Sequence, residues 1–217
     1  KDLGLENDRI YKTYQEMAEK ESTRADGIDV VSIVTPNHLH VPIAKIFAEK
    51  GIHIICDKPI GMSSKEAIDL KKVIESKKLI FALTHNYTGY PMVRHARSLV
   101  QKGDLGSLRV IQAEYPQDWL TTKAEDSGLK QAEWRTDPNR SGAGGCIGDI
   151  GTHAYNLIRF ITGLEVDEIS ADIHTFVEGR KVDDNAQIML RFKEGAKGSI
   201  WSSQVAVGNE NNLKIRI

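Results

Sequence analysis

The sequence predicts an α/β fold in which part of a parallel sheet is followed by an α+β domain with a mainly antiparallel open sheet. The first observation is that three short apolar runs alternate with helical segments over the first 83 residues. The second is a change after about residue 109, where strand-like segments alternate apolar and polar residues and short turns separate them. The third is an ordinary globular composition, with 40% hydrophobic and 27% charged residues among 217.

The first strand–helix unit follows a predicted helix at residues 11–20. Residues 30–35 form a β-branched run that suits a strand buried on both faces. A break at residues 36–38 ends it, and Pro42 stands where an early helix residue is expected. Gly51 is a natural end for this helix, because glycine readily adopts the left-handed conformation of a helix C-terminus.

The same unit then repeats. A second buried strand is predicted at residues 52–56 and a third at residues 79–83. Between them, Ser63 and Glu66 form a capping box at the start of a helix whose apolar face runs to Ile74. Strands that alternate with helices imply parallel pairing through right-handed crossovers. This is half of a doubly wound, Rossmann-type sheet.

The second half of the chain has the pattern of an antiparallel sheet. Residues 193–196 read as a hairpin turn between two strands. A long insert occupies residues 117–140, and a helix is predicted at about 148–162. Four strands are predicted, at residues 109–114, 168–176, 186–192 and 197–205. We therefore divide the chain into residues 1–95, the C-terminal part of a dinucleotide-binding domain, and residues 96–217, a substrate-binding and oligomerisation domain.

Composition narrows the class of protein. The net charge of −1 provides no field that would draw the chain to nucleic acid or to an anionic membrane. The longest apolar runs have the length of strands, which is too short to span a bilayer. Cys56 and Cys146 lie far apart and lack metal-site spacing, so we expect reduced thiols in a cytoplasmic protein without a bound metal.

Both ends of the chain have the appearance of internal sequence. The first residue is Lys1 rather than methionine, and residues 213–217 read as a strand stopped in mid-pattern. The glycine fingerprint of a dinucleotide-binding domain is expected two strands before Val30. We therefore interpret the chain as a fragment at both ends. The residue that would distinguish NAD from NADP is expected in the preceding part.

Two motifs follow the first two predicted strands directly. They are residues 35–40 (TPNHLH) and residues 56–60 (CDKPI). Ligands of doubly wound sheets bind at the carboxyl ends of the strands, so both motifs are placed for binding. Lys58, held just beyond a buried strand, could hydrogen-bond a substrate hydroxyl and lower its pKa. Each motif alone is equally compatible with prolines that only shape a loop and with a solvated lysine.

A glycine-rich segment in the second half carries a third motif. In residues 144–153 (GGCIGDIGTH), Asp149 and His153 are four apart and share one face of a helix, so the carboxylate could orient the imidazole as an acid–base pair. Taken alone, an acidic helix N-terminus above a core histidine is the simpler interpretation. Gly142 and Gly144 are not a phosphate loop, because neither the third glycine nor a preceding buried strand is present.

The long insert contributes Trp119, Trp134 and Arg135. Aromatic rings flanked by polar groups suit the faces and hydroxyls of a sugar. Packing of an irregular loop explains the same residues equally well. Cys56 and Cys146 adjoin proposed site residues, but we interpret both as small buried side chains.

Together, these motifs resemble the Gfo/Idh/MocA oxidoreductase family, which includes glucose–fructose oxidoreductase and inositol dehydrogenase. Residues 35–40 resemble the loop that borders the cofactor in that family. Residues 57–59 match its Glu-Lys-Pro signature, with Asp57 in place of glutamate. Asn86 and Tyr87 match the segment where cofactor and substrate meet, and residues 144–153 match the glycine-rich stretch that ends in Asp-x-x-x-His.

The resemblance implies a sugar or polyol dehydrogenase that uses NAD or NADP and forms a homo-oligomer, a dimer or a tetramer, through its open sheet. It also suggests a cis bond between Lys58 and Pro59. The implied catalytic residues are Lys58, Asp149 and His153. The implied cofactor-binding residues are Thr35, Pro36, Asn37, His40, Asp57, Lys58 and Asn86. The expected substrate-binding residues are Lys58, Tyr87, Asp149 and His153, to which the aromatic and polar character of the insert adds Trp119, Trp134 and Arg135 as candidates.

The expected chemistry is removal of a hydride from an alcohol carbon and of a proton from its hydroxyl. His153 would accept the proton, Asp149 would stabilise the imidazolium, and Lys58 would stabilise negative charge on the oxygen. Two alternatives remain open. One is a sensor of the same fold that binds nucleotide or sugar without chemistry. The other is a redox-neutral enzyme that uses the nicotinamide transiently to hydrolyse or eliminate a sugar derivative.

Overall fold

The structure is a computed structural model that describes residues 4 and 6–217. The chain divides into two compact units, Lys1–Thr84 and His85–Ile217. The boundary predicted at residue 95 falls inside helix α4 (Pro91–Lys102), which belongs to the second unit. Within the described residues, no helix is both long enough and apolar enough to cross a membrane.

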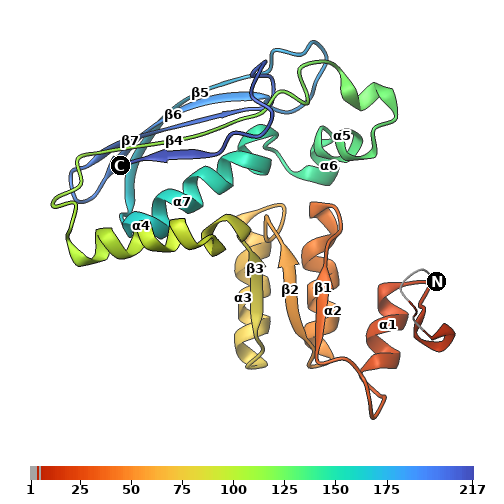
Figure 1. The fold of residues 1–217 in the computed structure, drawn as a ribbon. Helices are drawn as coiled ribbons and strands as arrows, with labels where there is room; N and C mark the ends of the chain where they lie inside the picture. The colour runs from red at the N-terminus through yellow and green to blue at the C-terminus, as the bar shows by residue number, and fades with distance from the viewer. Residues whose placement is uncertain (1–3, 5) are drawn as a thin grey trace. The chain divides into compact units, whose positions relative to one another are not determined.

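The first unit contains the predicted parallel sheet, in the order β1-β2-β3 (Figure 1). Neighbouring strands are parallel and in register, with Ile33 opposite Cys56 and Cys56 opposite Leu83. Its strands are β1 (Val30–Ile33), β2 (His53–Asp57) and β3 (Phe81–Thr84). Its helices are η1 (Asn7–Arg9), α1 (Tyr14–Glu21), η2 (Asn37–Leu39), α2 (His40–Glu49) and α3 (Ser64–Ser76). The order strand, helix, strand, helix, strand is confirmed.

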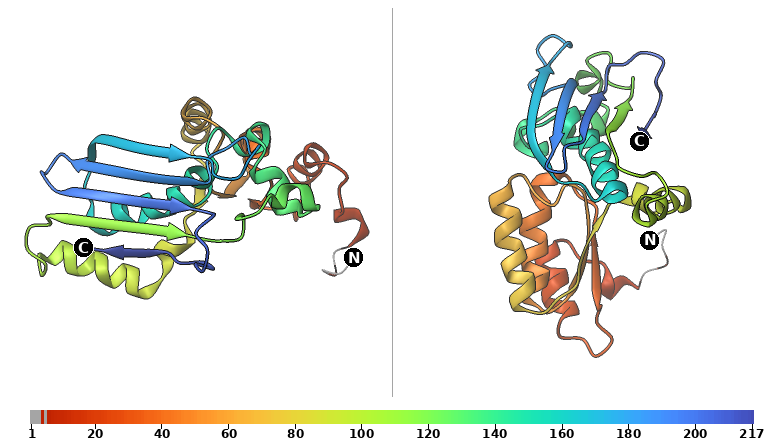
Figure 2. Two further views of the ribbon diagram at one scale, coloured as in Figure 1. Left: turned by 90° about the horizontal axis from the view of Figure 1, so that it is seen from above. Right: turned by 90° about the vertical axis from the view of Figure 1, so that its left-hand side faces the viewer.

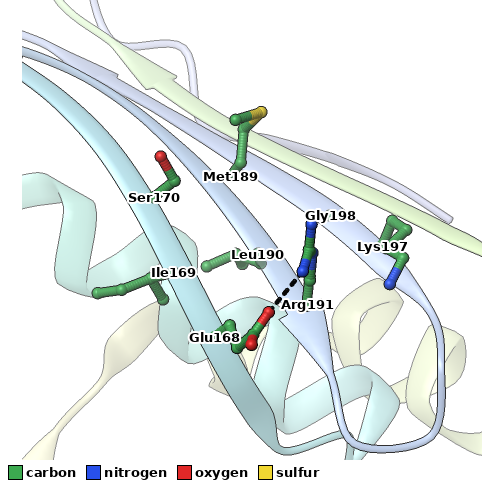
Figure 3. Close-up of a pocket in the computed structure, with 8 residues that line it drawn as sticks. All are labelled: Glu168, Ile169, Ser170, Met189, Leu190, Arg191, Lys197 and Gly198. Atoms are coloured by element: carbon green, nitrogen blue, oxygen red, sulfur yellow. Dashed lines mark hydrogen bonds and ion pairs between the residues drawn. The ribbon is translucent and has the colours of Figure 1, made fainter.

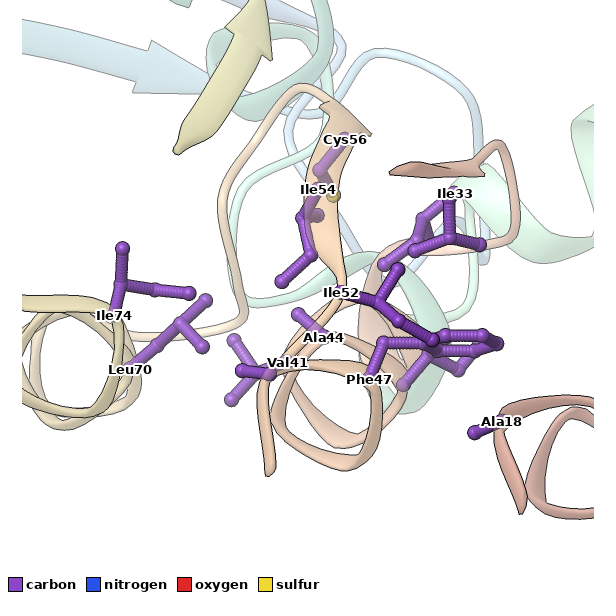
Figure 4. Close-up of a cluster of buried hydrophobic side chains, with 13 residues drawn as sticks. Ala18, Ile33, Val41, Ala44, Phe47, Ile52, Ile54, Cys56, Leu70 and Ile74 are labelled. Atoms are coloured by element: carbon purple, nitrogen blue, oxygen red, sulfur yellow. The ribbon is translucent and has the colours of Figure 1, made fainter. Parts of the chain in front are cut away.

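Helices α2 and α3 pack against each other, and the core of this unit forms where α2 meets the sheet. Phe47 of α2 and Ile54 of β2 are almost completely buried in this core, beside Leu70 of α3 (Figure 4). The predicted capping box starts α3: the Ser63 hydroxyl accepts from the Glu66 amide at 3.2 Å. The Glu66 carboxylate reaches back to the Met62 amide at 2.9 Å, one residue earlier than the standard pattern.

The second unit is a five-stranded sheet in the order β5-β6-β7-β4-β8. Strands β4 and β7 pair in parallel, and the remaining pairs are antiparallel, so the predicted mainly antiparallel sheet is confirmed. The strands are β4 (Val110–Pro116), β5 (Val166–His174), β6 (Asn185–Phe192), β7 (Lys197–Ser203) and β8 (Lys214–Arg216). The helical segments besides α4 are η3 (Asn86–Gly89), η4 (Ala124–Ser127), α5 (Lys130–Arg135), α6 (Pro138–Ser141), η5 (Ile147–Gly151) and α7 (Thr152–Thr162).

Helix α7 covers one face of this sheet. It packs against β4, β7 and β8 on one side and against α4 on the other (Figures 1 and 2). Along β4, Ile111, Ala113 and Tyr115 face this core and are buried. The helix predicted at residues 148–162 is confirmed from residue 152, but residues 147–151 form a π turn. Such turns occur frequently at functional sites.

The opposite face of the sheet is open over the described residues. Alternation along the strands places Met189 and Ser170 on this face and Leu190 and Ile169 on the other (Figure 3). Met189 is 65% exposed, and the neighbouring Glu168 and Arg191 form an ion pair at 2.7 Å. The outer face therefore combines an exposed apolar side chain with paired charges.

A buried arginine ties the long insert to the connection between β5 and β6. The Arg180 guanidinium donates to both carboxylate oxygens of Glu125 at 3.0 Å and to Asp184 at 3.2 Å. It also donates to the backbone oxygens of Leu120 at 2.9 Å and Thr122 at 3.0 Å. One side chain thus fixes the insert at several points.

We expect Arg180→Met to lower the free energy of unfolding by about 3–5 kcal/mol, because it leaves buried carboxylates without their cation. The Asp184 side chain is 1% exposed, so water cannot replace the lost partner. Urea unfolding would measure the change. The matched control is Arg191→Met, which breaks an ion pair with Glu168 in which both side chains are more than half exposed. It should lower the free energy of unfolding by about 1 kcal/mol or less. Equal losses for the two variants would contradict this account of the insert.

Candidate active site

The loop after β1 presents buried polar atoms at the carboxyl end of the sheet. Asn37 is 6% exposed. The Thr35 hydroxyl and Nδ1 of His38 are buried and make no hydrogen bond to any residue that the structure describes. Buried polar atoms usually have partners in a folded protein. The Thr35 hydroxyl and Nδ1 of His38 are therefore candidates for hydrogen bonds with a bound molecule.

The loop after β2 carries the predicted lysine. Asp57 ends β2, and its carboxylate accepts a hydrogen bond from the Thr84 hydroxyl at 2.7 Å, which joins the end of β2 to the end of β3. Lys58 follows directly, and the Lys58–Pro59 peptide bond is cis, as expected from the resemblance. Asp57, at the position where the family signature has glutamate, therefore links two neighbouring strands of the sheet.

His40 lies at the start of α2 with 1% of its surface exposed. Its Nδ1 lies 2.6 Å from the carbonyl oxygen of Pro59, and its Nε2 lies 2.8 Å from the carbonyl oxygen of Thr35. The resemblance implies that this residue borders the cofactor. In the structure both of its ring nitrogens are occupied by the backbone of the two loops.

The glycine-rich segment of the second unit is shaped by Asp183, which sequence reasoning did not identify. The Asp183 carboxylate accepts from the amides of Gly145 at 2.6 Å and Ile147 at 2.9 Å, and it lies 3.0 Å from the Cys146 sulfur. A Cβ atom on Gly145 would lie 2.0 Å from the Asp183 carbonyl oxygen. The glycine is therefore required by close approach of another backbone segment.

Asp149 lies in the π turn that precedes α7, and two side chains from elsewhere reach it. Its carboxylate accepts from Nε2 of Gln204 at 2.9 Å and pairs with Nε of Arg135 at 3.3 Å. The Arg135 guanidinium also lies over the Trp134 ring, 4.1 Å from its centre. The structure thus brings together three predicted site residues from the insert and the glycine-rich segment, and adds Gln204.

His153 lies one turn further along and is 8% exposed. Its ring contacts the Tyr87 ring edge-on at 4.8 Å, and the rings of His85 and Tyr115 lie at 6.0 and 6.1 Å. Tyr87 was predicted from sequence to meet this site, whereas His85 and Tyr115 were not identified. Aromatic side chains therefore surround the imidazole and restrict its orientation.

A chain of hydrogen bonds fixes these tyrosines. The Tyr115 hydroxyl donates to Oδ1 of Asn211 at 2.7 Å, so the Tyr87 hydroxyl is the donor in their 2.6 Å contact. Burial and the hydrogen bond with Tyr87 raise the pKa of the Tyr115 phenol, which keeps it neutral and able to donate. The chain continues through Gln117, which donates to Asn211 at 2.8 Å and accepts from the Trp119 indole at 3.0 Å.

The other predicted residues make mainly local contacts. Asn86 is exposed on the η3 turn, and the Trp134 indole donates within its own helix, to Gln131 at 3.3 Å. Both cysteines are buried, as predicted. Burial and the nearby Asp57 carboxylate raise the pKa of the Cys56 thiol to about 12, and burial also raises that of Cys146. Among the described residues, no cluster of His, Cys, Asp and Glu is arranged to hold a metal ion.

Comparison with known proteins places the chain among oxidoreductases. Residues 2–85 match the model of the oxidoreductase family with an NAD-binding Rossmann fold, and residues 93–217 match the GFO/IDH/MocA C-terminal domain. An uncharacterized oxidoreductase, YfiI, from Bacillus subtilis is 34% identical over 99% of this chain and 55% of its own length. Levoglucosan dehydrogenase from Pseudarthrobacter phenanthrenivorans is 32% identical over 88% of this chain and 53% of its own length.

Solved structures agree with this assignment. An inositol dehydrogenase homologue from Azotobacter vinelandii, complexed with NAD⁺, superposes with a TM-score of 0.96 at 30% identity and covers 99% of this chain and 56% of its own. An oxidoreductase from Sinorhizobium meliloti is 47% identical over the same shares, with a TM-score of 0.86. The chain thus spans about half the length of the relatives it matches. It belongs to the GFO/IDH/MocA oxidoreductase family.

Proposed function

We propose that the protein transfers a hydride between NAD or NADP and a hydroxyl-bearing carbon of a sugar, a polyol or a sugar derivative. The observation that carries this proposal is the arrangement around α7. Asp149, paired with Arg135 and Gln204, precedes a histidine one turn away whose ring is enclosed by aromatic side chains. This arrangement suits a positioned proton acceptor, in a chain whose family contains dehydrogenases.

The roles of the residues follow from their chemistry. His153 accepts the proton of the substrate hydroxyl, and the negative charge of Asp149 favours the imidazolium that results. Lys58 supplies a positive charge of the kind that stabilises a developing alkoxide. Tyr87, whose hydroxyl is committed to Tyr115, holds one side of the imidazole in place.

The loops at the ends of β1 and β2 fit a dinucleotide. When bound, the nicotinamide supplies the carbon that accepts the hydride. The buried Thr35 hydroxyl and His38 nitrogen, which find no partner among the described residues, offer hydrogen-bonding groups at the strand ends where such ligands bind. The residues that would hold the dinucleotide are Thr35, Pro36, Asn37, Asp57, Lys58 and Asn86. His40 contacts the backbone of the two loops through the carbonyl oxygens of Thr35 and Pro59.

The environment of Arg135 favours an uncharged substrate. Its guanidinium is paired with Asp149, so its charge is already balanced within the site. Trp119 and Trp134 supply aromatic surface of the kind that packs against sugar rings. The relatives that carry levoglucosan and inositol in their names support the same class of substrate.

A screen of neutral sugars and polyols with each cofactor tests the proposal, using the protein as encoded in its organism. The expected result is reduced cofactor that accumulates with one of the alcohols, measured by absorbance. Product without net reduced cofactor would replace the proposal with the redox-neutral enzyme. Binding of cofactor or sugar without any product would replace it with the sensor.

We expect the protein to self-associate as a dimer or tetramer through the outer face of the five-stranded sheet, where Met189 is 65% exposed. Static light scattering at micromolar concentration would give the mass. Met189→Glu should lower the mass, because it places a charge on this apolar side of the contact. Ile68→Glu is the control: Ile68 is 54% exposed on α3, and the change should leave the mass unaltered. A monomeric wild type would contradict the expectation.

A further inference from the structure

His40 contacts the backbone of both loops that carry the cofactor and lysine motifs. Its ring is 1% exposed, so water does not compete for its nitrogens. The two partners are the carbonyl oxygens of Pro59, at 2.6 Å from Nδ1, and Thr35, at 2.8 Å from Nε2. Both distances lie within the range of good hydrogen bonds. The ring therefore bridges the two loops.

The chemistry of the two acceptors determines the protons on the ring. A carbonyl oxygen can only accept a hydrogen bond, so each ring nitrogen must donate. A neutral imidazole carries one N–H, and its other nitrogen would direct a lone pair at a carbonyl oxygen. Only the imidazolium donates from both nitrogens.

We infer that His40 is a doubly protonated clamp that fixes the loop after β1 to the loop after β2 and thereby positions Lys58. Thr35 follows β1, and Pro59 follows Lys58 directly, at the ends of adjacent parallel strands. Holding the Pro59 carbonyl limits the movement of the backbone from which the lysine side chain starts. The protonation of His40 does not depend on the proposed function. The effect of the clamp on catalysis rests on the proposed function.

Nuclear magnetic resonance of the imidazole nitrogens tests the protonation directly. The signals of His40 are assigned by their loss in His40→Asn, and the exposed His95 on α4 serves as an internal reference. In the buffer of the kinetic assay we expect both His40 nitrogens to carry a proton and to have similar ¹⁵N shifts. One protonated and one bare nitrogen, with widely separated shifts, would overturn the inference even if the enzyme is fully active.

Amide hydrogen exchange tests the clamp without any substrate. In His40→Asn, whose short carboxamide cannot reach both carbonyls, exchange should become faster in residues 35–40 and 57–60 than in the rest of the first unit. His95→Asn is the matched control and should change neither segment. Unchanged exchange in both loops, or an equal increase throughout the unit, would show that His40 does not act as a local clamp. If His40→Asn does not fold, the wild-type nitrogen shifts still decide the inference.

A double-mutant cycle links the clamp to Lys58. His40→Asn should lower kcat by about 10²-fold, the usual cost of a misplaced catalytic group, with a smaller change in KM. In a Lys58→Met background the same change should have little further effect, because the group that it positions is gone. Equal losses in the two backgrounds would assign His40 a role separate from Lys58. A doubly protonated His40 in a protein without dehydrogenase activity would contradict the proposed function and leave the clamp intact.

Discussion

His153→Ala should lower kcat by about 10²–10⁴-fold, the usual contribution of a positioned acid–base group. The hydride cannot leave the alcohol carbon as a ketone forms unless the hydroxyl proton has an acceptor, and no other group is assigned that task. Affinity for the cofactor should be nearly unchanged, because His153 is not among the residues assigned to the dinucleotide. Steady-state kinetics and calorimetric titration of the cofactor would measure the two quantities.

The control for this variant is His174→Ala, which removes an exposed histidine from β5. It should leave both kcat and cofactor affinity unaltered. Tyr115→Phe is an informative companion, since it keeps the ring beside His153 but removes the donor to Asn211. Turnover at the wild-type rate in His153→Ala would remove this residue from proton transfer, whatever the geometry around it.

Lys58→Met should lower kcat by about 10²–10³-fold, the range observed when a group that stabilises an oxyanion is removed. The substitution keeps the length of the aliphatic side chain but eliminates the charge that the mechanism places near the substrate oxygen. Initial rates measured at saturating cofactor and alcohol would give the loss. Lys58→Arg should recover little, because a planar guanidinium does not replace a compact ammonium at such a position.

Lys72→Met is the matched control, because Lys72 lies on α3 in the same unit and its side chain is 71% exposed. We expect no change in its kcat. A loss that is confined to KM in Lys58→Met would mean that the lysine binds substrate and transition state equally. That outcome would contradict its assignment to the developing alkoxide.

The elements that sequence predicted correctly are those with a strong local pattern. The parallel strands were recognisable because short apolar runs are followed by helix signals, and the Ser63 cap marked the start of α3. The expectation that these strands are buried on both faces was wrong for the described residues, since β1 and β2 bury one face and leave Val30 and Ile55 on the other more than a third exposed. Helix α4 was missed because the boundary between the two predicted domains was placed at residue 95, inside this helix. The parallel pairing of β4 with β7 also could not be predicted, since residues 110 and 197 carry no local signal of being neighbours.

The same distinction applies to the site. Asp149 and His153 lie within one glycine-rich motif, so their spacing alone singled them out as a candidate pair. Gln204, Tyr115 and Asn211 reach the site from separate places in the sheet and its loops, where alternation signals burial but not a partner. Gly145 belongs to the same motif, but only the structure shows that the Asp183 backbone approaches it too closely for a side chain.

Tracing the hydride from the alcohol carbon tests the proposed reaction itself. The alcohol identified by the screen is deuterated at the carbon that is oxidised, and the protein as encoded is incubated with oxidised cofactor. We predict that the deuterium is recovered on C4 of the accumulated reduced nicotinamide, in one-to-one ratio with the ketone, and that His153→Ala slows its appearance. Deuterium that remains in the product or is lost to water, with no label on the nicotinamide, would contradict the account.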